Sequence, residues 1–531
     1  SPIAQVQQQQ GGVASAGDRP AEHLPAFLLS SLFILLGVAA IAWFVLAVYH
    51  NPAIRQVIDW TPVDGEQSPS LILAFLVEFG IVLPILVLGL GLALIGLGYR
   101  LRSRRLTVAR WALVALIWLT AGAVFMILYS VITIVPDWLS VDGPSPNLAP
   151  LLVPLLLAIP LGLALLWLRR NIERAFFGQE MLSSHETRLA WNLLIPTLTV
   201  FVLVAARPLE QTFIRSLTDK RFAGQEVPAF VGLQNYQNLL GIRLDVVPCR
   251  IDDDTGECIR RTDGSLRWQS IDREALQEGY RTVWNVRLPA MGGEVRSLAI
   301  SGVDADFIRA IGTTLIFTVA SVSLELLIGL FIAMTVNSNF AGRGIMRAVM
   351  LVPWAIPTVI SARLWELMLK DTSAGIINRI LMDLNLIDMP QAWLSDAALQ
   401  LPMAIAVDVW KTSPFMALLL LAGLQTIPKE LYEAADVDGA SRVRQFFAIT
   451  LPLLSPTIVV ALVFRTLDAL RVFDLFNVMF GRQQLTMATY NYEVLVNNQQ
   501  DGYASAISII IFVLISMFAL VYVRMLSRET G

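Results

Sequence analysis

Residues 427–452 read Ile427-Pro-Lys-Glu-Leu-Tyr-Glu433-Ala-Ala-Asp-Val-Asp438-Gly439-Ala-Ser-Arg-Val-Arg-Gln-Phe-Phe-Ala-Ile449-Thr-Leu451-Pro452. Pro428 suits the start of a helix, because its fixed φ is already helical and its missing N–H is not needed there. Glu430 and Glu433 then lie near the positive end of the helix dipole. Gly439 readily adopts a positive φ, which ends helices. We therefore predict a short helix that ends in a sharp turn at Gly439.

A second helix is predicted after this turn. Ser441 can cap its first turn, and Leu451-Pro452 marks the return of the chain to an apolar run. Ala434 and Ala435 give the first helix little side-chain bulk, so that a groove of another protein can approach it closely. These local features leave two interpretations open: a helix that docks onto a partner, or an ordinary amphipathic connector.

The rest of the chain is strongly apolar. Of its 531 residues, 56% are hydrophobic and only 15% are charged, which excludes a soluble protein of this length. The formal charge of −3 forms no basic stripe, so nucleic-acid binding has no support. Ten runs are long enough to cross about 30 Å of hydrocarbon. We therefore expect an all-α polytopic membrane protein with about ten transmembrane helices, at Leu24–Val48, Leu71–Leu97, Trp111–Val135, Leu148–Leu168, Trp191–Phe213, Phe307–Val336, Ile345–Met368, Leu401–Leu424, Leu451–Val472 and Tyr503–Val523.

The basic residues of the short loops indicate the orientation. Arginines are concentrated after the second and fourth spans, at Arg100, Arg102, Arg104, Arg105, Arg110, Arg169, Arg170, Arg174 and Arg188. Short cytoplasmic loops collect such residues. Both termini and the loop 426–452 are therefore expected in the cytoplasm, and residues 218–306 outside.

The composition divides the chain into segments. Residues 1–23 are polar and rich in Gln and Gly, and we interpret them as a disordered cytoplasmic tail. Residues 24–190 contain four predicted spans, and residues 191–531 contain six. The external insertion 218–306 carries turn signals between short runs, which indicate a small cap containing β-structure.

Both cysteines of the chain, Cys249 and Cys258, lie in this insertion and flank the polar turn 252–256. An external location permits a disulfide, which we predict, with two unpaired thiols as the alternative. The aspartates of the turn lack the later glutamate of an EF-hand loop, and no metal site is expected.

The stretch 427–452 resembles the hallmark of ABC-importer permeases: Glu-Ala-Ala, three residues, Gly, nine residues, Ile-x-Leu-Pro. The chain fills it without a gap, and the resemblance favours the docking interpretation over the connector. The ATPase-coupling residues that it implies are Glu433, Ala434, Ala435, Asp438, Gly439, Ile449, Leu451 and Pro452.

Four further motifs resemble the carbohydrate branch of that family, in particular the larger permease of maltose-type systems. They are Phe230-Val-Gly-Leu-Gln-Asn-Tyr236, Leu351-Val-Pro-Trp-Ala-Ile-Pro357, Trp410-Lys-Thr-Ser-Pro-Phe415 and Gly502-Tyr-Ala-Ser-Ala506. The resemblance covers approximately residues 191–525 and implies a six-helix type I importer core.

It also implies a bacterial inner-membrane complex with a second permease, two cytoplasmic ATPase subunits that bind ATP and Mg, and an external sugar-binding protein. The implied mechanism is alternating access, in which ATP-driven closure of the ATPases moves the helix before Gly439. Maltose, maltodextrins, trehalose or another α-glucoside fit best, with glycerol 3-phosphate or a monosaccharide as the runner-up.

Three features depart from the family pattern. The four N-terminal spans exceed the core, and the external insertion is much smaller than in enteric maltose permeases. Phe480-Gly-Arg-Gln-Gln484 replaces a Thr-x-Gly-Gly-Pro-like turn after the ninth span. The way in which the external binding protein engages the chain therefore does not follow from the resemblance.

Charged residues within apolar spans are costly and need a partner or a function. Arg363/Glu366, Asp408/Lys411 and Arg465/Asp468 have i, i+3 spacing, so pairs that neutralise each other within one helix are one interpretation. The other is a sugar path, because the matching helices line the sugar site in maltose-type permeases. Its candidate residues are Trp410, Lys411, Thr412, Phe415, Arg465, Asp468, Arg471 and Phe473, with Arg465 and Asp468 as the strongest predicted contacts.

The chain is expected to catalyse no reaction and to carry no cofactor, because it has no phosphate-binding Gly-rich loop and only three His residues. An ion-coupled secondary carrier remains a rival, since it would also use intramembrane acids. A membrane enzyme for lipid-linked sugars is a second rival, for which no acidic or His-rich cluster stands out.

Overall fold

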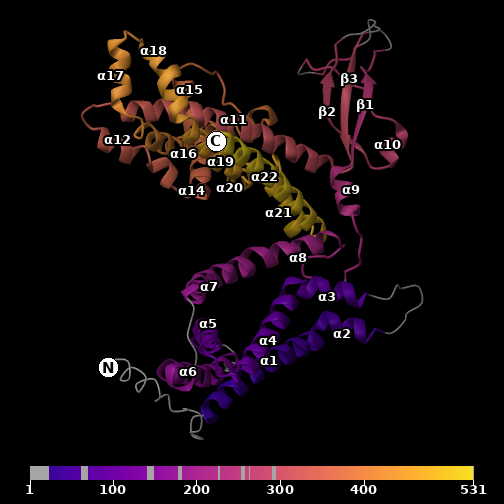
Figure 1. The fold of residues 1–531 in the computed structure, drawn as a ribbon. Helices are drawn as coiled ribbons and strands as arrows, with labels where there is room; N and C mark the ends of the chain where they lie inside the picture. Colours follow the sequence, from indigo (N-terminus) through magenta and orange to yellow (C-terminus); the bar gives the residue numbers. More distant parts are fainter. Residues whose placement is uncertain are drawn as a thin grey trace. The chain divides into compact units, whose positions relative to one another are not determined.

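The computed structural model describes residues 23–60, 70–139, 149–176, 182–224, 228–252, 257–261, 264–289 and 295–529. The predicted disordered tail 1–23 lies outside these residues except for His23. The chain forms two compact units, Ser1–Gln211 and Thr212–Gly531 (Figure 1). Each unit is described here by itself.

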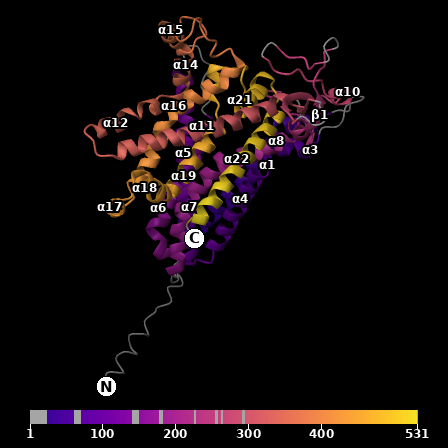
Figure 2. The same ribbon diagram turned by 90° about the horizontal axis from the view of Figure 1, so that it is seen from above.

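All elements that the structure describes in the first unit are helices. Its helices are α1 (His23–His50), α2 (Pro52–Ile58), α3 (Leu71–Phe79), α4 (Val82–Leu101), α5 (Leu106–Leu139), α6 (Ala149–Ala175), α7 (Leu182–Phe201) and, across the unit boundary, α8 (Arg207–Ser216). Helices α1 and α4 lie side by side (Figures 1 and 2). A Cβ atom on Gly37 would come within 2.4 Å of the Gly91 carbonyl oxygen, so small residues permit this close approach.

The second predicted span, Leu71–Leu97, is not one helix. The chain breaks after α3 at Gly80, whose φ of +67° is unfavourable for residues with a side chain. The Glu210 carboxylate accepts hydrogen bonds from the backbone N–H groups of Ile81 and Val82 at the start of α4. The apolar helix therefore begins at Val82.

The second unit combines a helical bundle with a small sheet. Its elements are α9 (Gln234–Leu240), β1 (Ile242–Pro248), α10 (Arg273–Gln277), β2 (Arg281–Arg287), β3 (Arg296–Gly302), α11 (Ala305–Asn337), α12 (Arg343–Val349), α13 (Val352–Ala355), α14 (Thr358–Met368), α15 (Ile376–Asp383), α16 (Ala397–Leu424), α17 (Lys429–Val437), α18 (Arg442–Gln445), α19 (Leu451–Ala469), α20 (Asp474–Met479), α21 (Met487–Tyr492) and α22 (Asp501–Glu529). Helices α11 and α16 pack along their lengths around residues such as Ala333, Met416 and Leu420.

Nine helices among the described residues are long and apolar enough to cross a membrane, and a bent segment makes a tenth if it counts as one span. The predicted all-α polytopic class is confirmed. The predicted seventh span, Ile345–Met368, is this segment, with an 87° bend between Ala355 and Thr358. Ile356 is extended, with φ −72° and ψ 130°, because a following proline disfavours helical backbone.

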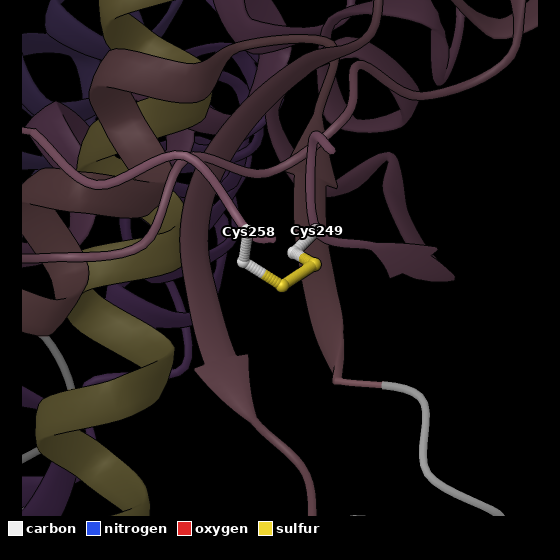
Figure 3. The surroundings of a disulfide bond; sticks show 2 residues. All are labelled: Cys249 and Cys258. Atoms are coloured by element: carbon white, nitrogen blue, oxygen red, sulfur yellow. A yellow bond between two sulfur atoms is a disulfide. The ribbon is translucent and has the colours of Figure 1, made fainter. Parts of the chain in front are cut away.

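The insertion carries an antiparallel sheet of order β1-β3-β2 (Figure 1). On one face, Val247 and Ala299 pack with Ile271 and Ala275 of the α10 region. The sulfur atoms of Cys249 and Cys258 are joined in a disulfide just after β1 (Figure 3). Arg243 of β1 lies 3.1 Å from Asp245, whose carboxylate raises the pKa of the guanidinium by accepting its hydrogen bond. The sheet and its packing against the α10 region show that the insertion has the expected β-structure.

Asp304 anchors the start of α11. Its side chain accepts a hydrogen bond from the Phe307 N–H at 2.9 Å, and the hydroxyls of Tyr490 and Tyr503 donate to it at 2.7 and 2.8 Å. Burial and the nearby Asp304 carboxylate raise the pKa of Tyr490, so the phenol stays protonated as a donor. These bonds connect the end of the cap to α21 and α22.

Candidate functional site

A cavity of about 660 Å³ lies within the bundle of the second unit, and we call it the central cavity. It is bounded by α16, by α19 with the turn that follows it, and by the bend between α13 and α14. Its lining includes Phe317, Trp354, Ile356, Pro357, Asp408, Lys411, Thr412, Phe415, Phe464, Arg465, Asp468, Arg471, Phe473 and Asp474. Charged and aromatic side chains thus face one space.

Arg465 is the centre of a buried ionic network. Its side chain is 4% exposed, and the side chain of Glu325 is fully buried. The Arg465 Nε and Nη2 atoms lie 2.6 and 2.8 Å from the two Glu325 carboxylate oxygens. Nη2 also lies 3.1 Å from Asp408, and Nη1 lies 2.6 Å from Asp468. One guanidinium therefore holds three carboxylates from α11, α16 and α19.

Asp468 is the member of this network that faces the cavity most openly. Its side chain is 59% exposed, and its second oxygen lies 3.6 Å from the guanidinium of Arg471. Thr412 donates a hydrogen bond of 2.7 Å to Glu325, which adds a further support to the buried carboxylate. The arrangement presents one oriented carboxylate and one exposed guanidinium to a ligand.

Lys411 supports the bent segment. Its ammonium donates hydrogen bonds to the carbonyl oxygens of Trp354 at 3.3 Å and Ile356 at 2.6 Å. These carbonyls lie in the last turn of α13 and just after its end, where helical hydrogen bonding stops, and unpaired carbonyls at membrane depth are costly. Asp408 and Lys411 do not form the i, i+3 ion pair that their spacing suggested. Asp408 pairs with Arg465 instead.

Aromatic rings form another part of the cavity wall. The rings of Trp354 and Phe415 stack with centroids 5.3 Å apart and planes 11° apart. Phe473 also lines the cavity and packs on Tyr492. Stacked rings offer a flat apolar surface beside the polar groups.

The structure places seven of the eight predicted path residues in this lining: Lys411, Thr412, Phe415, Arg465, Asp468, Arg471 and Phe473. Trp410 lies outside the lining and packs edge-to-face on Trp365, with centroids 5.4 Å apart. Successive residues of an α-helix point about 100° apart, so Trp410 faces away from the side of α16 where Lys411 and Thr412 line the cavity.

Sequence reasoning assigned neither Trp354 to the cavity wall nor Glu325 to the ionic network. Trp354 had a signal, since it lies between Pro353 and Pro357 in an apolar run. A proline inside an apolar run interrupts a helix, so Pro357 signals a break after Trp354 that can reorient its side chain.

The loop 426–452 has the predicted geometry. Helix α17 ends at Val437, and Gly439 has a φ of +73°. The Ser441 side chain caps α18 by accepting a hydrogen bond from the Arg444 N–H. Asp436 accepts a hydrogen bond of 2.5 Å from the Gln445 side chain and lies 3.4 Å from Arg442. The turn is therefore fixed by contacts between its two helices.

Helix α17 presents an open surface, since every one of its residues is at least partly exposed. The exposed group includes Glu433, Ala434 and Val437, the last with 89% of its surface accessible. The Tyr432 hydroxyl lies 2.9 Å from the Thr450 hydroxyl and connects α17 to the entry of α19. Ile449 packs against the bundle core, while Leu451 and Pro452 begin α19.

Comparisons with known proteins identify relatives in membrane transport systems. Residues 325–530 match the family model described as "Binding-protein-dependent transport system inner membrane component". The chain is 48% identical over 217 residues to the trehalose/maltose transport system permease protein MalF of Thermococcus litoralis, covering 40% of this chain and 72% of that protein. It is 38% identical over 230 residues to the sulfoquinovosyl glycerol transport system permease protein SmoG of Agrobacterium fabrum, covering 43% and 74%.

A longer match extends further along the chain. The trehalose transport system permease protein SugA of Mycobacterium tuberculosis is 29% identical over 342 residues, covering 64% of this chain and 89% of that protein. Among solved structures, a bacterial alginate ABC transporter in complex with an alginate pentasaccharide-bound periplasmic protein has a similar chain. That chain is 28% identical, with 42% of this chain and 80% of that chain covered and a TM-score of 0.40.

Nine or ten apolar helices among the described residues, together with a cavity lined by charged and aromatic side chains, are typical of a membrane transport subunit. The chain belongs to the family of binding-protein-dependent transport system inner membrane components, the permease subunits of ABC transporters. The resemblance seen in its sequence motifs is thereby confirmed.

Proposed function

We propose that this permease forms the translocation path of an ATP-driven importer for an α-glucoside such as trehalose, maltose or a maltodextrin. The observation that carries the proposal is the central cavity, where a stacked aromatic pair lies beside an oriented carboxylate. Two of its relatives are named for trehalose or trehalose/maltose transport. An aromatic face suits the C–H side of a sugar ring, and ionised groups form strong hydrogen bonds with hydroxyls.

We assign the direct sugar contacts to Asp468, Arg471, Trp354 and Phe415. Arg465 lines the cavity, but four of the five N–H groups of a guanidinium are already used by Glu325, Asp408 and Asp468. Its proposed role is therefore to hold Asp468 in place. Thr412, Lys411 and Phe473 complete the proposed path, whereas the position of Trp410 favours a packing role.

We propose that α17 docks into a groove of a cytoplasmic ATPase subunit. Its exposed small and apolar residues and its fixed turn support this role. Two such ATPases would bind ATP and Mg and hydrolyse ATP, while this chain catalyses nothing. The complex would also contain a second permease and an external sugar-binding protein, and both termini of this chain would lie on the cytoplasmic side of a bacterial inner membrane.

The test is the ATPase activity of the reconstituted complex with its binding protein. Trehalose, maltose, maltotriose, sucrose and glycerol 3-phosphate are compared. Stimulation by one or two α-glucosides supports the proposal. Stimulation by glycerol 3-phosphate alone would favour the runner-up, an importer of small anionic solutes, for which the exposed Arg471 guanidinium would be the anion-binding group.

Two variants test the assigned site within the same complex. Asp468→Asn keeps the shape of the side chain but removes the charge, and we expect sugar uptake to fall at least tenfold, about the effect of losing one charge-assisted hydrogen bond. The control is Asp383→Asn, which alters an exposed carboxylate of α15 paired with Arg379. Equal uptake by both variants would refute the placement of the sugar at Asp468.

A further inference from the structure

The first unit contains a cavity whose lining shares no residue with the central cavity. It is lined by α4, α5 and α7, has a volume of about 880 Å³, and we call it the tryptophan cavity. Trp111, Trp118 and Trp191 contribute to its lining, and Arg100 is the only charged residue there. It is therefore an apolar space with a cation at one end.

The dimensions of this cavity match one leaflet of a bilayer. Its lining on α4 runs from Leu90 to Arg100. Ten residues of helix span about 15 Å, which is half of a hydrocarbon core about 30 Å thick. The Trp118 indole donates a hydrogen bond of 3.3 Å to Asn192 and so connects α5 to α7 along the cavity. An extended acyl chain fits such a space, whereas water would find few polar partners in it.

The cation lies at the end where a headgroup would lie. Arg100 precedes the connection to α5, which also carries Arg102, Arg104 and Arg105. The positive-inside rule places this connection at the cytoplasmic face. Arg102 is engaged by Ser30 at 3.3 Å, but the Arg100 guanidinium makes no hydrogen bond or ion pair with the residues that the structure describes. Basic clusters at this depth attract anionic headgroups.

We propose that the tryptophan cavity binds one acyl chain of an anionic phospholipid, with its phosphate at Arg100. This gives the first unit a binding site of its own, for a lipid of the surrounding membrane. The proposal does not depend on the identity of the transported solute.

The test is native mass spectrometry of the detergent-purified complex after incubation with phosphatidylglycerol or phosphatidylcholine. Gly96 lines the cavity, and a Cβ atom there meets no atom within 4 Å, so Gly96→Leu fills the space without a clash at the backbone. Gly89 is equally open but lies outside the lining, two turns earlier on α4. Gly89→Leu is therefore the matched control.

We expect tight retention of phosphatidylglycerol by the unmodified complex and by Gly89→Leu, and its loss in Gly96→Leu. Arg100→Gln should weaken retention of phosphatidylglycerol about fivefold and leave that of phosphatidylcholine unchanged, because one interfacial cation contributes about 1 kcal/mol. Equal retention by the two glycine variants would overturn the proposal. So would a loss of the second permease, rather than of lipid, from the Gly96→Leu complex, since a protein segment would then be the occupant.

Discussion

Glu325→Gln tests whether the ionic network of the central cavity is shielded from water, as its burial indicates. The Glu325 carboxylate accepts three hydrogen bonds, from Arg465 Nε at 2.6 Å, Arg465 Nη2 at 2.8 Å and the Thr412 hydroxyl at 2.7 Å. Glutamine has nearly the same shape but replaces one acceptor oxygen with an NH2 donor. In either orientation of the amide, at least one N–H of Arg465 then faces another donor.

Burial sets the size of the expected effect. The side chains of Glu325 and Arg465 are 0% and 4% exposed, so the substitution leaves an N–H of a buried guanidinium facing another donor, while Asp408 and Asp468 remain as its counter-charges. Leaving a buried donor unsatisfied costs about 1–3 kcal/mol, and more when the group is charged. The Arg379–Asp383 pair has an N–O distance of 3.2 Å, but both side chains are more than 60% exposed. Asp383→Asn should therefore cost at most about 1 kcal/mol.

The free energy of unfolding is measured on the purified chain in detergent micelles, by titration with sodium dodecyl sulphate and far-UV circular dichroism. We expect Glu325→Gln to unfold at a clearly lower concentration of sodium dodecyl sulphate than Asp383→Asn. If the two variants lose the same free energy, water reaches the network, and the positioning role of Arg465 loses its basis.

Two further outcomes follow from the loop and the cap. Gly439→Val should reduce the sugar-stimulated ATPase activity of the reconstituted complex more than Gly439→Asn does. A positive φ costs a β-branched residue about 1–2 kcal/mol or more, while asparagine tolerates it. Equal activity of the two variants would show that the turn does not limit coupling. Alkylation without reductant should add no label to Cys249 or Cys258, and prior reduction should add two; labelling of both thiols without reductant would show that the bond does not form.

Local chemistry explains why the loop 426–452 could be predicted closely. A helix ends where its own residues provide the stop, so Asp438-Gly439 fixes the end of α17 without reference to the rest of the chain. Ser441 likewise caps α18 through a neighbour three residues away. The apolar runs likewise predicted the spans from local sequence alone, except where a glycine or proline interrupts them.

The pairing between helices could not be predicted in this way. The spacing of Arg465 and Asp468 correctly indicated a pair on one face of α19. The same spacing suggested a pair between Asp408 and Lys411, which does not form. Glu325 is 140 residues from Arg465 and nevertheless accepts two hydrogen bonds from its guanidinium. An i, i+3 spacing defines a helix face, but the helix packed against that face decides which charges meet.

Lys411 shows how a functional prediction and a structural role meet in one residue. The sequence suggests it as a donor to a sugar, and its side chain does line the central cavity. Two of the three N–H groups of its ammonium are used by the Trp354 and Ile356 carbonyls, which the turn before Pro357 frees from helical bonding. That turn brings the Trp354 ring against Phe415. Lys411 therefore contributes mainly to the shape of the central cavity. Its ammonium stabilises the backbone segment that carries the Trp354 ring of the aromatic wall.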